Sequence, residues 1–71
     1  MQIFVNGESV EVDGSRSYIS YEDLCELAEI NADSNPSVIF TTKANKGIIN
    51  KGFYGPLTER AIYNVCCTGN A

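Results

Sequence analysis

Residues 1–12 read MQIFVNGESVEV and contain two alternating segments separated by Asn6-Gly7. Asn-Gly is the strongest short signal for a β-hairpin, because a type I′ turn requires φ > 0 at both of its central residues. A two-residue turn here sets Ile3 opposite Val10, and the same register places Phe4 on the other face of the hairpin. The face that includes Ile3 then carries four apolar side chains: Met1, Ile3, Val10 and Val12.

A helix is predicted to begin near Ser20. Ser20 and Asp23, three residues apart, are similar to the capping box that closes the first turn of a helix. The helix should run for about ten residues and end before Pro36, which prevents its continuation. At about 100° per residue, one arc of this helix holds the apolar side chains Tyr21, Leu24, Cys25, Leu27 and Ala28.

The remaining segments alternate between strand-like and turn-like sequence. β-branched residues predict a third strand over residues 37–42 and a short fourth strand at Ile48-Ile49. Glycines predict a loop over residues 51–56, and a helical turn is expected over residues 57–60. Residues 61–67 are predicted to form the last strand, followed by a flexible tail of small residues.

The composition predicts one globular domain, which we place at residues 1–67, with the tail at residues 68–71. Of the 71 residues, 44% are hydrophobic and 20% are charged, which is typical of a globular domain and not of a disordered segment. The chain has no His, which excludes Ser–His and Cys–His catalytic pairs and Cys–His zinc sites. We therefore expect no enzymatic activity, no cofactor and no metal. Three cysteines, two of them adjacent at Cys66 and Cys67, predict reduced thiols and a cytoplasmic protein.

The charge is unevenly distributed along the chain. Residues 1–36 carry eight acidic and one basic side chain (net −7), and residues 37–71 carry four basic and one acidic (net +3), which gives the formal net charge of −4. This acidic balance argues against a nucleic-acid partner. No apolar stretch approaches the ~18 residues of a membrane span, so no membrane partner is expected. The lysines Lys43, Lys46 and Lys51 are interpreted as surface residues that favour solubility.

These segments predict an α+β fold, in which one helix covers one face of a four- to five-stranded mixed sheet. If the last strand lies beside the first, the two strands run parallel, which is the β-grasp arrangement. The predicted core draws on the hairpin, the helix, the third strand and the last strand, and consists of Met1, Ile3, Val5, Val10, Val12, Leu24, Leu27, Ala28, Val38, Tyr63 and Val65.

Several short motifs resemble ubiquitin and occur in the same order along nearly the whole chain. Residues 1–5 (MQIFV) are the pentapeptide that opens ubiquitin, and residues 38–40 (VIF) are similar to its Leu-Ile-Phe strand after the helix. Residues 57–59 (LTE) resemble the Leu-Ser-Asp that precedes its last strand. The helix start at residues 20–24 (SYEDL) and the ending TGNA at residues 68–71 resemble small bacterial ubiquitin-like proteins. Those proteins are encoded beside E1-, E2- and deubiquitinase-like enzymes in phage-defence operons.

The resemblance implies a protein modifier that acts through its C-terminus. An E1-like enzyme would adenylate the terminal carboxylate, and an E2-like enzyme would pass it to target proteins, with a deubiquitinase-like peptidase as a further partner. The conjugation tail would be Thr68, Gly69, Asn70 and Ala71. The family favours a terminal Gly-Gly, which this tail lacks. Two versions remain open: trimming to expose Gly69, or activation of Ala71 itself.

The resemblance also implies a partner-binding patch on the sheet. Phe4 and Ile39 should point away from the helix if Ile3 and Val38 point towards it, and Ile62 joins them if Tyr63 and Val65 face the helix. In ubiquitin the isoleucine that matches Ile39 lies at the centre of such a patch. Exposed apolar clusters on a small protein indicate an interface.

Two other functions remain as alternatives. The chain could be a non-covalent β-grasp module that binds partners, or self-associates, through Phe4, Ile39 and a sheet edge. It could also be a sulfur carrier that holds a terminal thiocarboxylate after trimming. Neither requires a catalytic residue in this chain.

Overall fold

The computed structural model describes residues 1–67, and within them the chain forms a five-stranded sheet and a two-stranded sheet. The expected hairpin is present as β1 (Gln2–Val5) and β2 (Glu8–Glu11), and Ile3 pairs with Val10 as predicted. Asn6 and Gly7 have φ values of 52° and 84°, which is the left-handed conformation that the turn requires. The hairpin register is therefore confirmed.

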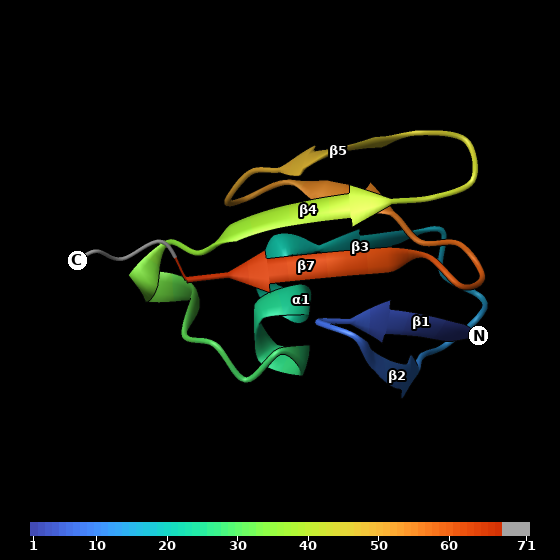
Figure 1. Cartoon of the computed structure of the whole chain (residues 1–71), viewed down its shortest axis with the longest axis horizontal. Coiled ribbons are helices and arrows are strands. Elements are labelled where there is room, and N and C mark those ends of the chain that lie inside the picture. Colours follow the sequence, from blue (N-terminus) through green and yellow to red (C-terminus); the bar gives the residue numbers. More distant parts are fainter. Residues whose placement is uncertain (68–71) are drawn as a thin grey trace.

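The five-stranded sheet has the order β2-β1-β7-β4-β5 (Figure 1). Its other strands are β4 (Ser37–Thr41), β5 (Lys46–Ile49) and β7 (Ile62–Cys66). The central strand β7 runs parallel to β1 and antiparallel to β4. The predicted pairing of the first and last strands is thus confirmed, and the fold is an α+β fold of the β-grasp type.

Asn6 joins the hairpin turn to the central strand. Its side-chain amide donates to the backbone carbonyl of Val65 at 3.1 Å, and its side-chain oxygen accepts from the Val65 amide at 2.8 Å. Just beyond the end of β1, the Asn6 side chain thus bonds to the backbone of β7 as a neighbouring strand would. The same residue satisfies the turn and fixes the last strand in place.

The helix α1 (Tyr21–Leu27) covers one face of the sheet. As predicted, Ser20 is its N-cap, and the Ser20 hydroxyl accepts from the Asp23 amide at 3.0 Å. The helix is shorter than expected, because Glu29 adopts a φ of 59° and ends it. The Glu29 amide donates to the Glu26 carbonyl at 3.0 Å, and the Ile30 amide donates to the Cys25 carbonyl at 2.9 Å. These two bonds form a Schellman motif. The short 3₁₀ helix η1 (Ala32–Ser34) then leads to Pro36 and β4.

A two-stranded sheet was not predicted. β3 (Tyr18–Ser20) pairs antiparallel with β6 (Tyr54–Pro56), where the sequence had indicated only a loop over residues 51–56. The predicted helical turn over residues 57–60 is also wrong. The chain makes a turn closed by the Ala61 amide and the Thr58 carbonyl at 3.1 Å, with Arg60 at a φ of 64°.

The core lies between the sheet, the helix and the β3–β6 ribbon. Of the predicted core residues, Ile3, Val5, Leu24, Val38, Tyr63 and Val65 are buried, and Met1, Val10, Val12 and Ala28 pack partly buried against them. Leu27 was wrongly placed in the core: it is 37% exposed, because it lies at the margin of the helix arc centred on Tyr21, Leu24 and Cys25. Tyr21 and Cys25, which lie on the predicted apolar arc of the helix, are also buried in the core. The core further includes residues that the prediction omitted: Ile19, Ile49, Leu57 and Ala61.

Candidate functional site

The predicted interaction residues meet on the face of the sheet opposite the helix. In β1 and β7, Phe4 and Ile62 are direct partners across the parallel pair. On β4, Ile39 pairs with Asn64 of β7, and Thr41 pairs with Ile62, so Ile39 and Ile62 are diagonal neighbours on this face. Ile39 is 40% exposed and Ile62 is 42% exposed, whereas Phe4 is half-buried. The fold therefore brings the three residues to one surface.

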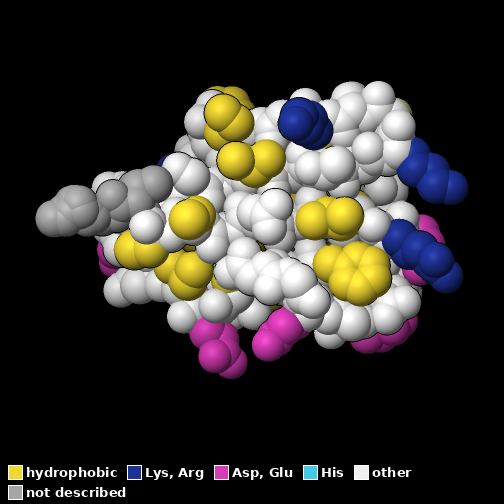
Figure 2. Space-filling model, in the orientation of Figure 1, with side chains coloured by type: hydrophobic (Ala, Val, Ile, Leu, Met, Phe, Trp, Pro, Cys, Tyr) yellow, Lys and Arg dark blue, Asp and Glu magenta, His cyan; other side chains and the backbone are white. Residues whose placement is uncertain are grey.

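Ile48 extends this surface and was not predicted to belong to it. It pairs directly with Ile39 across β4 and β5, and its side chain is 69% exposed. We call Phe4, Ile39, Ile48 and Ile62 the open-face patch. In Figure 1, β7 and β4 lie in front of α1, so the viewer looks onto the face of the sheet opposite the helix. Figure 2 has the same orientation and shows separate groups of hydrophobic side chains across this face. The alternation at Ile48-Ile49 could have identified Ile48, had its strand been placed beside β4.

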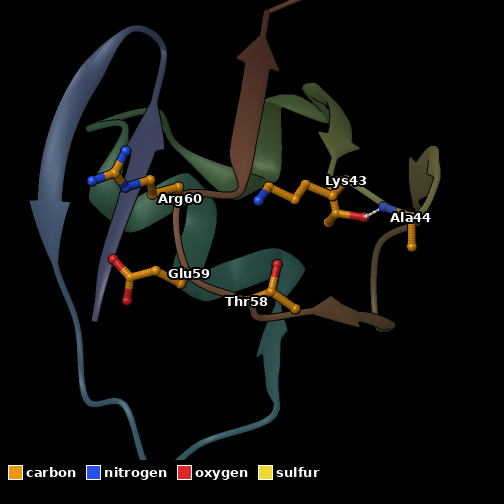
Figure 3. Close-up of a pocket in the computed structure, with 6 residues that line it drawn as sticks. Lys43, Ala44, Thr58, Glu59 and Arg60 are labelled. Atoms are coloured by element: carbon orange, nitrogen blue, oxygen red, sulfur yellow. Dashed lines mark hydrogen bonds between the residues drawn. The ribbon is translucent and has the colours of Figure 1, made fainter.

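Two hollows lie at one end of the sheet, and the smaller of them is lined in part by Ile62 of the open-face patch. The larger, of about 500 Å³, lies between residues 42–44 and residues 58–60, and a smaller one of about 230 Å³ reaches Ile62. In Figure 3, the Lys43 amine extends towards the segment of Arg60, whereas the Arg60 guanidinium points away towards β1. The basic end of the sheet therefore borders the apolar patch.

Hydrogen bonds to backbone groups hold both walls of the larger hollow. The Thr42 hydroxyl accepts from the amides of Ala44 at 3.2 Å and Asn45 at 3.1 Å, which fixes the loop between β4 and β5 (Figure 3 shows the first bond). The Arg60 amide donates to the Gln2 carbonyl at 2.7 Å, and the Glu59 carboxylate accepts from the Gln2 amide at 3.3 Å. Sequence reasoning missed this site, because its two walls are distant along the chain.

The three thiols occupy different environments. Cys25 lies on the buried face of α1, and burial raises the pKa of its thiol, which favours the unreactive protonated form. Cys66 and Cys67 are exposed at the end of β7, and Cys67 lies 3.8 Å from the Ser34 hydroxyl. All three are free cysteines, as predicted.

The predicted conjugation tail, Thr68, Gly69, Asn70 and Ala71, lies outside the described residues. The strand that leads to it, β7, ends at Cys66 and lies between β1 and β4 in the middle of the sheet. Among residues 1–67, no group of three or more acidic or cysteine side chains is arranged to hold a metal ion. No helix in this range combines the length and apolar character needed to cross a membrane.

Comparison of the chain with protein-family models, with curated proteins and with solved structures finds no match.

Proposed function

We propose that this chain is a ubiquitin-like protein modifier, conjugated to target proteins through a carboxyl group in residues 69–71. The observation that carries the proposal is the β-grasp topology, with the final strand β7 at the centre of the sheet and parallel to β1. The sequence motifs that resemble ubiquitin fall on the corresponding elements: MQIFV on β1 and VIF on β4.

The firm anchoring of β7 in the sheet suits a domain that presents the residues after Cys67 to an enzyme. Val65 pairs with Val38 of β4 on one side and exchanges two hydrogen bonds with the Asn6 side chain on the other. Tyr63 is fully buried, and its hydroxyl donates to the Pro56 carbonyl at 2.6 Å. The four residues after Cys67 have small side chains, which a narrow enzyme channel could accept.

In this function the chain supplies a carboxylate and a recognition surface, and its partners supply the catalysis. An E1-like enzyme adenylates the terminal carboxylate with ATP and releases pyrophosphate, and an enzyme cysteine then displaces AMP to form a thioester. An E2-like enzyme accepts the thioester, and a target amine then displaces the thiol. The open-face patch would serve as the surface that these enzymes, and a deubiquitinase-like peptidase, recognise.

The test is to express the tagged chain in its native host and to purify it under denaturing conditions, which retain only covalent adducts. Arg60 is the last Lys or Arg in the sequence, so trypsin leaves on each target lysine a remnant that begins at Ala61. A remnant of residues 61–69 would identify Gly69 as the reactive end, and one of residues 61–71 would identify Ala71. A chain that lacks residues 68–71 is the matched control, and we expect it to form no adducts.

The observation that favours a second candidate, a non-covalent binding module, is the exposure of Ile39 and Ile62 in the open-face patch. If the recovered chain has its unmodified full-length mass in every fraction, the modifier proposal is wrong. Capture of a partner under native conditions that is lost on Ile39→Asp would then favour the module. A terminal thiocarboxylate without target adducts would instead indicate a sulfur carrier.

A further inference from the structure

The two outer strands of the five-stranded sheet, β2 and β5, each have one side that no other strand of the described chain pairs with. Unpaired strand edges present rows of backbone N–H and C=O groups that can pair with another chain. These two edges lie at opposite ends of the sheet order, so one molecule offers two separate edges (Figure 1).

The hydrogen bonds of each hairpin fix which backbone groups face outward. The Val12 amide donates to the Met1 carbonyl at 2.8 Å, and the Thr42 amide donates to the backbone carbonyl of Asn45 at 2.8 Å. Hydrogen-bonded and non-hydrogen-bonded pairs alternate along antiparallel strands. The backbone groups that turn away from the sheet are therefore those of Ser9 and Glu11 in β2 and those of Lys46 and Ile48 in β5. Within residues 1–67, no hydrogen bond connects these outward groups to another segment.

The two edges carry opposite charge. β2 has the sequence ESVE, with acidic residues at Glu8 and Glu11, and Asp13 follows it. β5 begins at Lys46 and lies between Lys43 and Lys51 in sequence. In Figure 2, acidic side chains line the margin of the molecule where β2 lies, and basic side chains occupy the margin of β5 and the adjoining end of the sheet. Edges of this kind attract each other and repel their own type.

Strand direction is compatible with pairing between two copies. β2 is antiparallel to β1, β1 is parallel to β7, and β4 is antiparallel to both β7 and β5. β5 therefore runs antiparallel to β2. A second copy placed beside the first in the same orientation thus sets β5 antiparallel to the neighbouring β2, with both helices on the same face of the joined sheet.

One register satisfies side-chain orientation, backbone bonding and charge together. Lys46 opposite Glu11 places Gly47 opposite Val10, Ile48 opposite Ser9 and Ile49 opposite Glu8, which uses the whole length of both strands. In this register the outward backbone groups of Lys46 and Ile48 meet those of Glu11 and Ser9. The Lys46 and Glu11 side chains lie on the same face and form an ion pair, and Ile48 of the open-face patch lies beside Ser9.

We propose that the protein self-associates head to tail, with β5 of one copy adding to β2 of the next in this register. The contact is heterologous, because one copy contributes β5 and the other contributes β2. A row of such copies has a free β2 at one end and a free β5 at the other, so the assembly is open-ended. It is a weak interface, because four residues a side bury little area and the net charge of −4 opposes close approach. The association needs no conjugating enzyme and goes beyond the proposed modifier function.

The test is sedimentation velocity of the purified full chain over a concentration series up to ~1 mM, the range of weak complexes. We expect the sedimentation coefficient of the wild type to rise with concentration. Lys46→Glu and Glu11→Lys each place like charges opposite each other, and each should weaken the association several-fold. A one-to-one mixture of the two variants restores opposite charges at every contact, so association should return. Arg60→Glu makes the same charge reversal at a residue outside β2 and β5, and is the matched control for Lys46→Glu.

A second pair of variants tests the backbone bonds. Ile48→Pro removes an N–H that faces outward and leaves the bonds between β4 and β5 intact, so the chain should fold but not associate. Ile48→Thr keeps this N–H and should associate as the wild type does. Glu11 also accepts a hydrogen bond from the Met1 amine at 2.9 Å, so circular dichroism must show that Glu11→Lys is folded.

Three outcomes would overturn the proposal. The wild type could remain a monomer over the whole series, or the mixture of charge variants could fail to recover association. Association could also persist in Ile48→Pro and disappear in Ile39→Asp, which would place the contact on the open-face patch. Since the test uses no E1- or E2-like enzyme, its result does not depend on whether conjugation occurs.

Discussion

At the scale of single residues, two buried tyrosines donate hydrogen bonds to proline carbonyls: Tyr21 to Pro36 and Tyr63 to Pro56, both at 2.6 Å. Burial raises the pKa of Tyr63 to about 12, and burial also raises the pKa of Tyr21 above its ordinary value of 10.0. The folded protein therefore holds these phenol protons more tightly than the unfolded chain does. The stability that they contribute is fully present below pH 10 and is lost as the pH rises towards about 12.

We predict that Tyr63→Phe lowers the free energy of unfolding at pH 7 by about 1 kcal/mol, because the Pro56 carbonyl loses its donor. The variant should also lose less stability than the wild type above pH 10, since it has one phenol fewer to ionise. Urea unfolding between pH 7 and pH 11.5 measures both effects. Tyr54→Phe is the control, because Tyr54 is 66% exposed. An alkaline loss of stability equal to that of the wild type would contradict the prediction.

At the scale of elements, the β3–β6 ribbon depends on the absence of a side chain at Gly55. Gly55 pairs with Ile19, and Ile49 packs directly against it from β5. A Cβ at this position would collide with Cδ1 of Ile49 and lie 2.8 Å from its Cγ1. Because Ile49 is itself buried, its side chain has little space in which to move.

We predict that Gly55→Ala lowers the free energy of unfolding by about 1–3 kcal/mol, through overpacking. Ile49→Val removes the Cδ1 atom that collides, so the double variant should be destabilised by less than the sum of the single effects. Urea unfolding of the four proteins gives this coupling. Gly14→Ala serves as the control, because a Cβ there meets Met1 at an ordinary 3.5 Å. Additive effects would mean that Ile49 does not limit the space at Gly55.

At the scale of the whole molecule, Cys25 reports on the opening of the domain. It is 1% exposed within the core shared by the helix and the sheet, whereas Cys66 and Cys67 are exposed. We predict that a thiol reagent labels two cysteines rapidly and the third at a rate that follows global unfolding, because a small domain exposes its core mainly by unfolding cooperatively.

The measurement is labelling kinetics over a urea series, followed by intact mass. Replacing Cys66 and Cys67 by Ser should remove the rapid phase and leave the slow one unchanged. Slow labelling that does not accelerate with urea would show that Cys25 becomes exposed by local opening of α1 and not by unfolding of the domain.

Local sequence signals predicted the elements whose partners lie close along the chain. Asn6-Gly7 determined the turn, and with it the register of β1 and β2, because few residue pairs adopt positive φ at both positions without strain. Ser20 determined the start of α1 through a hydrogen bond three residues away. Side-chain alternation placed Phe4, Ile39 and Ile62 on the face opposite the helix, as the strand pairings confirm.

Features that join distant segments were not predicted. Ile19 and Gly55 pair within the ribbon, but a three-residue strand has too little periodicity to be distinguished from a loop. The helix ends at a left-handed position that is usually occupied by glycine, but here the residue is Glu29. The sequence therefore contains no glycine to mark this boundary. Leu27 matched the apolar arc in sequence, but only packing against the sheet could show that this edge of the helix faces solvent.

The sequence by itself determined the hairpin, the helix start, the alternation of the long strands and the segregation of acidic from basic residues, because each depends on residues a few positions apart. Tertiary structure alone decided that β2 and β5 are the two edges of the sheet, that Ile48 joins the open-face patch, and that Lys43 and Arg60 border one hollow. Those features depend on which strands become neighbours. Burial of the whole core selects that arrangement, and no local signal encodes it.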